Sequence, residues 1–176
     1  MNLDKILDLD IRLSTRLRIG EKPRIIRLIA LFLAHSGDSW FWVLGLFLVW
    51  LSKNPYWRPR ALIIGVGVII TAVIVLLIKF TIRRRRPEGE WGGIYRKSDP
   101  HSFPSGHATR SFMLAVMTIG LGPAWFAIVL LIWAPLVGLA RVAMGVHYLS
   151  DVVAGSVLGI IIGWVNYLLI PMVLFS

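Results

Sequence analysis

The chain has 176 residues, of which 57% are hydrophobic and only 16% are charged, and its net charge is +10. Soluble domains carry about 25% charged residues, so this composition excludes an ordinary soluble domain and predicts an integral membrane protein. The basic residues lie between and beside apolar runs, where they anchor helices or meet lipid headgroups, so we expect membrane lipids and no nucleic acid as partners. The absence of cysteine excludes disulfides, thiolate metal sites and a cysteine nucleophile.

Residues 1–22 are predicted to form an amphipathic segment at the membrane interface. Apolar side chains recur there every three or four positions, at Ile6, Leu9, Leu13 and Leu17. This spacing is typical of a helix with one apolar face. The segment lacks the apolar core of a cleavable signal peptide, so we expect it to stay in the protein.

Six apolar segments follow, and they predict an all-α, polytopic membrane helix bundle in a single domain, residues 1–176. Their ranges are 25–34, 40–51, 61–79, 105–121, 124–140 and 148–175. A helix needs about 20 residues to cross the hydrocarbon core, so the first two are short, and whether residues 23–36 cross fully stays open. With about six crossings, both ends of the chain are expected on the same side of the membrane.

The last apolar segment carries a regular glycine pattern. Gly155, Gly159 and Gly163 are spaced four residues apart and therefore lie on one helix face. Small residues at this spacing allow the backbones of two membrane helices to approach closely. We interpret the pattern as a packing surface.

The crossing pattern brings three polar segments to one side of the membrane. Lys79 ends the third apolar segment, and the one long polar loop, residues 81–104, follows it. The segment 141–151 connects the last two apolar runs on the same side. We call this side the polar end. Ionisable residues near membrane depth are costly, so their convergence indicates a functional site.

Several polar-end residues suit a phosphate dianion. Lys79, Arg86 and Arg141 supply positive charge. Ser105 and Gly106 open a helix, where backbone N–H groups and the helix dipole favour an anion, with Ser105 as the N-cap. Fixed cations combined with a helix N-terminus predict a phosphate pocket.

Three further residues suit phosphoryl transfer. His147 and Asp151 are one helical turn apart, so they can form an imidazole–carboxylate pair that leaves one ring nitrogen free to attack phosphorus. His107 then remains to protonate the leaving oxygen. On spacing alone, a metal pair or a histidine hydrogen-bonded at a helix start stays open.

Other polar residues are given smaller roles. The arginine run 83–86 is typical of a topological anchor, with Arg86 as the exception. His35 has no evident partner, which indicates a packing role. At most, Asp99 and His101 are expected to contact other residues of the site rather than the substrate.

The chain resembles the type 2 phosphatidic acid phosphatase superfamily of membrane lipid phosphatases. The signature of that family is lysine, six residues, arginine-proline; then proline-serine-glycine-histidine; then serine-arginine, five residues, histidine, three residues, aspartate. The corresponding segments are KFTIRRRRP at 79–87, PSGH at 104–107 and ARVAMGVHYLSD at 140–151. Ala140 replaces the usual serine and removes one hydroxyl donor. A neutral hydrogen bond contributes about 0.5–1.5 kcal/mol, so we expect weakened phosphate binding rather than inactivity.

The resemblance implies a metal-independent phosphatase without a cofactor. It implies His147 as the nucleophile that forms a phosphohistidine, Asp151 as its orienting group, and His107 as general acid and later base. The implied phosphate ligands are Lys79, Arg86, Ser105, Gly106 and Arg141.

The implied substrate is a lipid phosphate or pyrophosphate in the membrane. Undecaprenyl pyrophosphate, phosphatidic acid, phosphatidylglycerophosphate and a lipid A phosphate are candidates, with an isoprenoid pyrophosphate first. The residues do not choose among them, and they do not indicate an oligomeric state. A vanadate-bound haloperoxidase shares the pocket, but known relatives of that kind are soluble. A catalytically inactive lipid-phosphate-binding or transport protein is the alternative, although it would not need His107, His147 and Asp151.

The distribution of basic residues predicts the orientation. If both termini lie opposite the polar end, ten basic residues lie on that opposite side and nine at the polar end, of which phosphate accounts for three. The excess predicts that the opposite side is cytoplasmic. We therefore expect an integral protein of the cytoplasmic (inner) membrane whose active site faces the extracytoplasmic side, as the resemblance also implies.

Overall fold

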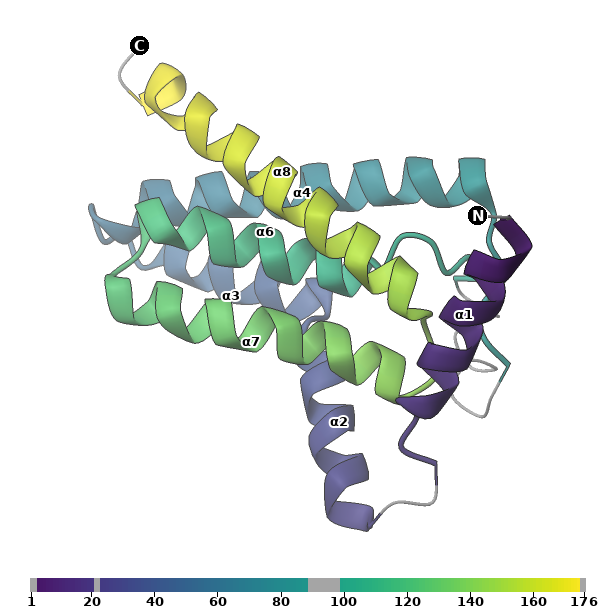
Figure 1. The fold of residues 1–176 in the computed structure, drawn as a ribbon. Coiled ribbons are helices and arrows are strands. Elements are labelled where there is room, and N and C mark those ends of the chain that lie inside the picture. The colour runs from purple at the N-terminus through teal and green to yellow at the C-terminus, as the bar shows by residue number, and fades with distance from the viewer. Residues whose placement is uncertain (1–2, 21–22, 89–98, 175–176) are drawn as a thin grey trace.

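The computed structural model describes residues 3–20, 23–88 and 99–174, and within them the chain is helical with no strand (Figure 1). The helices are α1 Leu3–Arg16, α2 Arg24–Ser36, α3 Ser39–Leu51, α4 Trp57–Ile82, α6 Gly106–Leu121, α7 Ala124–Ala143 and α8 Leu149–Leu174. The predicted all-α class is confirmed. Every predicted apolar segment corresponds to one helix, with boundaries that differ by a few residues.

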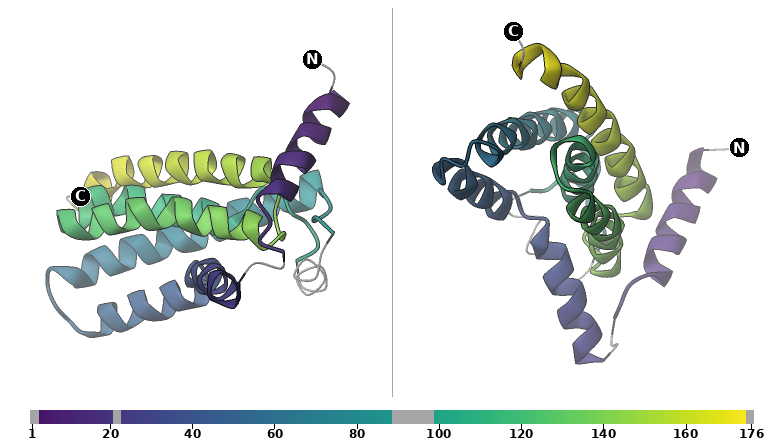
Figure 2. Two further views of the ribbon diagram at one scale, coloured as in Figure 1. Left: turned by 60° about the horizontal axis from the view of Figure 1, so that its bottom comes forward. Right: turned by 90° about the vertical axis from the view of Figure 1, so that its left-hand side faces the viewer.

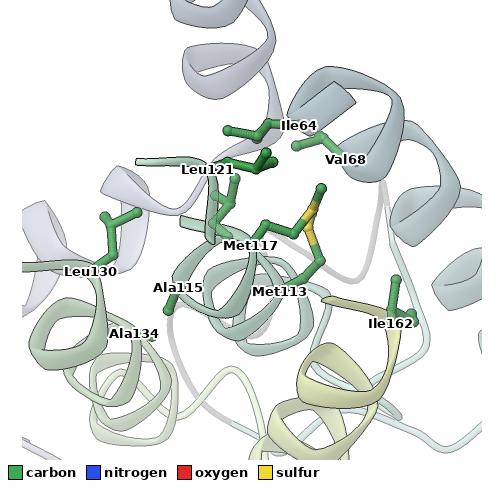
Figure 3. Close-up of a cluster of buried hydrophobic side chains, with 10 residues drawn as sticks. Ile64, Val68, Met113, Ala115, Met117, Leu121, Leu130, Ala134 and Ile162 are labelled. Atoms are coloured by element: carbon green, nitrogen blue, oxygen red, sulfur yellow. The ribbon is translucent and has the colours of Figure 1, made fainter. Parts of the chain in front are cut away.

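Helix α6 forms the centre of the bundle and packs against α4, α7 and α8 (Figures 1 and 2). A cluster of buried apolar side chains fills the space between these four helices (Figure 3), and it includes Ile64, Val68, Met113, Met117, Leu130 and Ile162. Lipid tails are as apolar as these side chains, so close packing rather than exclusion of water holds such helices together.

The predicted glycine surface of α8 lies directly against α6. A Cβ atom added to Gly159 would lie 2.1 Å from the backbone oxygen of Thr109, and one added to Gly155 would lie 2.6 Å from that of Ser105. Neither position has room for a side chain. The packing interpretation is confirmed, and the contact fixes the start of α8 relative to the start of α6.

Alanine at Gly159 is therefore expected to destabilise the protein. The added methyl group must push α8 away from the α6 backbone, and overpacking of this kind costs about 1–3 kcal/mol. The measurement is the melting temperature of the detergent-solubilised variant. Gly65→Ala is the control, because no atom lies within 4 Å of a Cβ added there. Equal melting temperatures for both variants would contradict the packing described here.

Helix α1 lies at the polar end and contacts the start of α8. Asp10 accepts a hydrogen bond from the backbone N–H of Ser150 at 3.0 Å, and Ser14 accepts one from Leu149 at 2.8 Å. Asp10 and Ser14 are buried, whereas the apolar side chains Ile6, Leu9, Leu13 and Leu17 are exposed. The polar face of α1 therefore contacts the protein, and its apolar face is free for lipid.

The structure does not confirm six crossings. Among the described helices, α4, α7 and residues 149–169 of α8 are long and apolar enough to cross, and α2 with α3 counts as one more if it is a broken span bent by 56°. Helix α2 runs across the bundle axis rather than along it (Figure 1). The prediction that both ends of the chain lie opposite the polar end is therefore wrong, because α1 lies at the polar end and α8 runs away from it.

This correction changes the distribution of charge along the bundle axis. Outside the predicted phosphate ligands, α1, the two residues after it and the loop after α4 carry seven described basic residues at the polar end: Lys5, Arg12, Arg16, Arg18, Arg83, Arg84 and Arg85. The turn between α3 and α4, with the first turn of α4, carries three at the opposite end: Lys53, Arg58 and Arg60. The charge count that predicted an outward-facing site rested on the wrong placement of α1.

Candidate active site

A cavity of about 230 Å³ lies at the polar end. Its lining includes six of the predicted site residues, Lys79, Arg86, Gly106, His107, Arg141 and His147. The other two predicted residues, Ser105 and Asp151, are buried behind this lining. Side chains that are up to 68 positions apart, from Lys79 to His147, thus surround one small space.

Three cations from different elements surround the cavity. Lys79 lies in the last turn of α4 and Arg141 in the last turn of α7, where positive charge is favourable to the helix dipole. Arg86 comes from the following loop and donates to the backbone oxygen of Val146 at 2.9 Å. All three cations are buried, with exposed fractions of 4%, 0% and 4% in the order named. Such an arrangement suits an anion with more than one negative charge.

Asp99 lies closer to these cations than the sequence indicated. Its Oδ2 accepts from Arg86 Nη2 at 2.7 Å and also from Lys79 Nζ, and Asp99 itself lines the cavity. Burial would raise the pKa of the Asp99 carboxyl, but Lys79 and Arg86 outweigh it and hold that pKa below its usual range. An ionised carboxylate therefore lies between two of the predicted phosphate ligands.

The start of α6 forms another wall of the cavity. Ser105 is the N-cap, and its hydroxyl accepts from the backbone N–H of Ala108 at 3.5 Å, as the sequence predicted. The backbone N–H of Ser105 donates to the Asp151 backbone oxygen at 2.9 Å. Gly106 lines the cavity, and a Cβ there would lie 3.3 Å from Val75. The positive end of the helix dipole therefore faces the same space as the cations.

His147 is held in the tautomer that a nucleophile needs. Its Nε2 lies 3.1 Å from Arg86 Nη1, and because a guanidinium can only donate, Nε2 must be the unprotonated nitrogen. Its Nδ1 lies 3.6 Å from Asp151 Oδ2, which is ion-pair range but longer than a hydrogen bond. Burial, together with the charges of Arg86 and Arg141, outweighs Asp151 and lowers the pKa of His147 to about 3. The imidazole is therefore neutral near pH 7.

Arg84 is a site residue that the sequence analysis treated as an anchor. Its guanidinium donates to Asp151 Oδ1 at 2.6 Å and to Asp10 Oδ2 at 2.7 Å. It also lies over the ring of Tyr148, 4.1 Å from the ring centre. Helix α1 thus supports the partner of His147 through Arg84. Arg84 stands in a run of four arginines, so no sequence pattern separates it from its neighbours.

His107 has a partner that the sequence analysis missed. Its Nε2 lies 2.6 Å from Oδ1 of Asp38, in the turn between α2 and α3. The other oxygen of Asp38 lies 3.1 Å from His35 Nδ1, a partner that is not evident from the sequence. Asp38 is 69 positions from His107, and nothing in the local sequence connects the two.

Metal ligands do not cluster in the described part of the chain. Within residues 3–20, 23–88 and 99–174, no three His, Asp or Glu side chains converge in a group that could hold a metal ion. The cavity is lined mainly by positive and neutral groups, with Asp99 as the acidic residue.

Comparison with known proteins assigns the family. The sequence profile described as the PAP2 superfamily matches residues 60–174, which contain the whole cavity lining apart from Ser39 at the start of α3. The chain belongs to the PAP2 superfamily. The match covers most of α4 and all of α6, α7 and α8, and these helices with the loops between them carry the cations and both histidines.

Individual PAP2 relatives agree with this assignment. The chain is 33% identical over 132 residues to decaprenylphosphoryl-5-phosphoribose phosphatase of Mycobacterium tuberculosis, covering 74% of this chain and 73% of the relative. It is 32% identical over 144 residues to undecaprenyl-diphosphatase of Sulfolobus acidocaldarius, covering 78% and 66%. The predicted family and the predicted enzyme class, a membrane phosphatase, are confirmed.

Two crystal structures share the fold. A transmembrane PAP2-type phosphatidylglycerolphosphate phosphatase from Bacillus subtilis superimposes with a TM-score of 0.79 at 20% identity, covering 98% of this chain and 89% of that one. LpxE from Aquifex aeolicus superimposes with a TM-score of 0.70 at 21% identity, covering 90% and 94%. At this identity the likeness supports the fold, and the residue roles rest on the geometry above.

Proposed function

We propose that the protein hydrolyses a lipid phosphate or pyrophosphate without a metal ion, through a phosphohistidine on His147. The observation that supports this most is one cavity lined by an unprotonated His147 Nε2, by His107, and by four buried cations, which are the three described above and Arg110. Together they supply a nucleophile, a proton donor and a phosphate cradle around the same space.

In the first step, His147 Nε2 bonds to phosphorus while the bond from phosphorus to the lipid oxygen breaks. His107, as imidazolium, gives its proton to that oxygen. The positive charge that develops on the His147 ring is stabilised by Asp151, 3.6 Å away, a distance that we expect to shorten when substrate binds. In the second step, water attacks phosphorus, His107 takes a proton from it, and the bond to His147 breaks to release phosphate.

The substrate is proposed to carry a long hydrocarbon chain, with a polyprenyl phosphate as the first choice. A second cavity of about 850 Å³, lined mainly by apolar side chains of α2, α3 and α4, opens beside the phosphate cavity. His35 lies in its wall. The names of the mycobacterial and Sulfolobus relatives both specify polyprenyl carriers, which supports the same class here.

The proposal is tested by phosphate release from purified protein in detergent with and without EDTA. The panel is undecaprenyl pyrophosphate, phosphatidic acid, phosphatidylglycerophosphate and a lipid A phosphate. We expect the highest kcat/KM with the polyprenyl substrate and full activity in EDTA, because the buried cations already neutralise phosphate. Loss of activity in EDTA that one added metal restores would contradict the metal-free mechanism.

We further propose that the polar end faces the cytoplasm, which reverses the orientation expected from sequence. Seven described basic residues flank the phosphate site at the polar end, against three at the opposite end. Positively charged loops stay preferentially on the cytoplasmic side. The site would then act on lipid phosphates of the inner leaflet.

Cysteine labelling tests this orientation, because the chain has no native cysteine. Pro55→Cys places an exposed thiol at the opposite end, and Glu88→Cys places one at the polar end. A membrane-impermeant thiol reagent should label Pro55→Cys in intact cells and Glu88→Cys only after lysis. The reverse pattern would restore the outward-facing site.

A further inference from the structure

The turn between α2 and α3 is anchored to the start of α6 and to two tryptophans. The Gly37 backbone oxygen accepts hydrogen bonds from Arg110 Nε at 3.0 Å and from its Nη2 at 2.6 Å. Trp42 donates to the Ser36 backbone oxygen at 3.1 Å, and Trp133 donates to its hydroxyl at 2.8 Å. Side chains of α3, α6 and α7 therefore hold the backbone before Asp38 in place.

This anchored turn presents a carboxylate to two imidazoles. Asp38 Oδ1 lies 2.6 Å from His107 Nε2, and Asp38 Oδ2 lies 3.1 Å from His35 Nδ1. His107 lines the phosphate cavity and His35 lines the apolar cavity. Asp38 is thus the link between the two spaces, and it holds the histidine that is proposed to move the proton.

We propose that Asp38 is a positioning residue that makes His107 an effective general acid and base. The inference rests on the proposed function. A carboxylate can only accept, so Asp38 fixes the Nε2–H tautomer of His107. Nδ1 is then the nitrogen that exchanges a proton with substrate, and within the described residues it has no hydrogen-bond partner.

The proton balance is simple under this assignment. In the first step, the Nδ1–H of the imidazolium gives its proton to the leaving oxygen as the bond from phosphorus to oxygen breaks. In the second step, Nδ1 takes a proton from the attacking water. The hydrogen bond from Nε2–H to Asp38 persists through both steps, and the carboxylate stays ionised.

The charges around His107 show why it needs a carboxylate. Burial lowers the pKa of His107 well below its ordinary value, and the charges of Arg141 on α7 and Arg110 on its own helix lower it further. Asp38 from the α2–α3 turn opposes these effects and favours a proton on the imidazole. If Asp38 loses its charge, the imidazolium is faced by positive groups only. His107 would then lose its proton at a lower pH and act as a weaker acid.

The test is Asp38→Asn, which keeps the shape and removes the charge. We expect kcat/KM on lipid phosphate to fall by about 10²-fold, at the lower end of the usual contribution of a general acid. The alkaline limb of the pH profile should move to lower pH. The rate of p-nitrophenolate release in the first turnover of p-nitrophenyl phosphate should change only a few-fold, because that leaving group needs no acid.

Three further variants separate positioning from a structural role. Asp8→Asn makes the same change on the exposed face of α1 and should leave all three readouts unchanged. Asp38→Glu keeps the charge and should retain the wild-type alkaline limb at reduced rate. His35→Gln removes one partner of the Asp38 carboxylate. It should shift the alkaline limb of the pH profile in the same direction as Asp38→Asn, but by less.

The outcomes distinguish a failure of the positioning role of Asp38 from a failure of the proposed phosphatase function. An unmoved alkaline limb in Asp38→Asn, with equal losses for both leaving groups, would overturn the positioning role. If Asp38→Asn does not fold, two other results together would overturn the positioning role. These are an unchanged alkaline limb of the pH profile in His35→Gln, and equal losses of activity with both leaving groups in Asp38→Glu. Failure of the proposed function looks different, because wild-type protein itself would then release no phosphate from any lipid.

Discussion

His147→Ala is expected to abolish turnover of every phosphate substrate, by about 10⁴-fold or more. No other described side chain places an unprotonated nitrogen against the cations of the cavity in the way that His147 does, with Nε2 accepting from Arg86. The identity of the leaving group should not matter, because the attack on phosphorus precedes or accompanies its departure in all cases.

Phosphate release from lipid substrates and p-nitrophenyl phosphate is the measurement for this variant. His101→Ala is the matched control, because His101 lies in the same loop region but outside the cavity lining, against the ring of Phe80. We expect His101→Ala to stay within a few-fold of wild type. Residual turnover in His147→Ala that exceeds about 1% of wild type would show that another group attacks phosphorus.

His107→Ala is expected to separate substrates by leaving group. General acids contribute about 10²–10⁴-fold when the leaving group is poor, so hydrolysis of a lipid phosphate, whose leaving group is an alkoxide, should fall by that amount. p-Nitrophenolate leaves without protonation, so the first step on p-nitrophenyl phosphate should persist. The second step needs His107 to activate water, and phosphorylated enzyme should therefore accumulate.

Rapid-quench measurement of the p-nitrophenolate burst tests this separation in one detergent. Wild type should turn over steadily, His107→Ala should give a burst followed by slow release, and His147→Ala should give no burst. Equally deep losses of the first step with both leaving groups in His107→Ala would mean that the roles of the histidines are assigned wrongly.

The sequence predicted the helices and most of the cavity for a physical reason. Apolar runs of membrane length leave few alternatives to helices, and the number of crossings determines which polar segments share a side. The sequence could therefore place Lys79, Arg86 and Arg141 on the same side of the membrane. The four-residue glycine spacing likewise predicted the contact between α8 and α6, because only one helix face carries it.

The position of α1 could not be predicted in the same way. Periodicity shows which side chains share a face of the helix, but not which side of the membrane the helix lies on. The deciding contacts are made by Asp10 and Ser14 with the first N–H groups of α8, which are more than 130 positions away. The charge count that predicted the orientation of the whole protein rested on this one misplaced helix.

The roles of Asp38 and Arg84 and the contacts of Asp99 were not predicted, for a related reason. Each acts through a partner that is distant in sequence, so no spacing pattern connects them to the site. Asp38 follows a glycine in a short polar turn, which is an ordinary sequence for a helix connection. The signal that was available was the cost of a carboxylate between two apolar runs, which indicates a buried partner.

The most direct test of the account is to trap the phosphoenzyme. Wild type, His107→Ala and His147→Ala are mixed with ³²P-labelled p-nitrophenyl phosphate, quenched in alkali within milliseconds, and digested to locate the label. We predict label on His147 that survives base and is lost in acid, as a phosphorus–nitrogen bond requires, with more label in His107→Ala and none in His147→Ala. Turnover without protein-bound label, or label on any other residue, would contradict the covalent histidine mechanism.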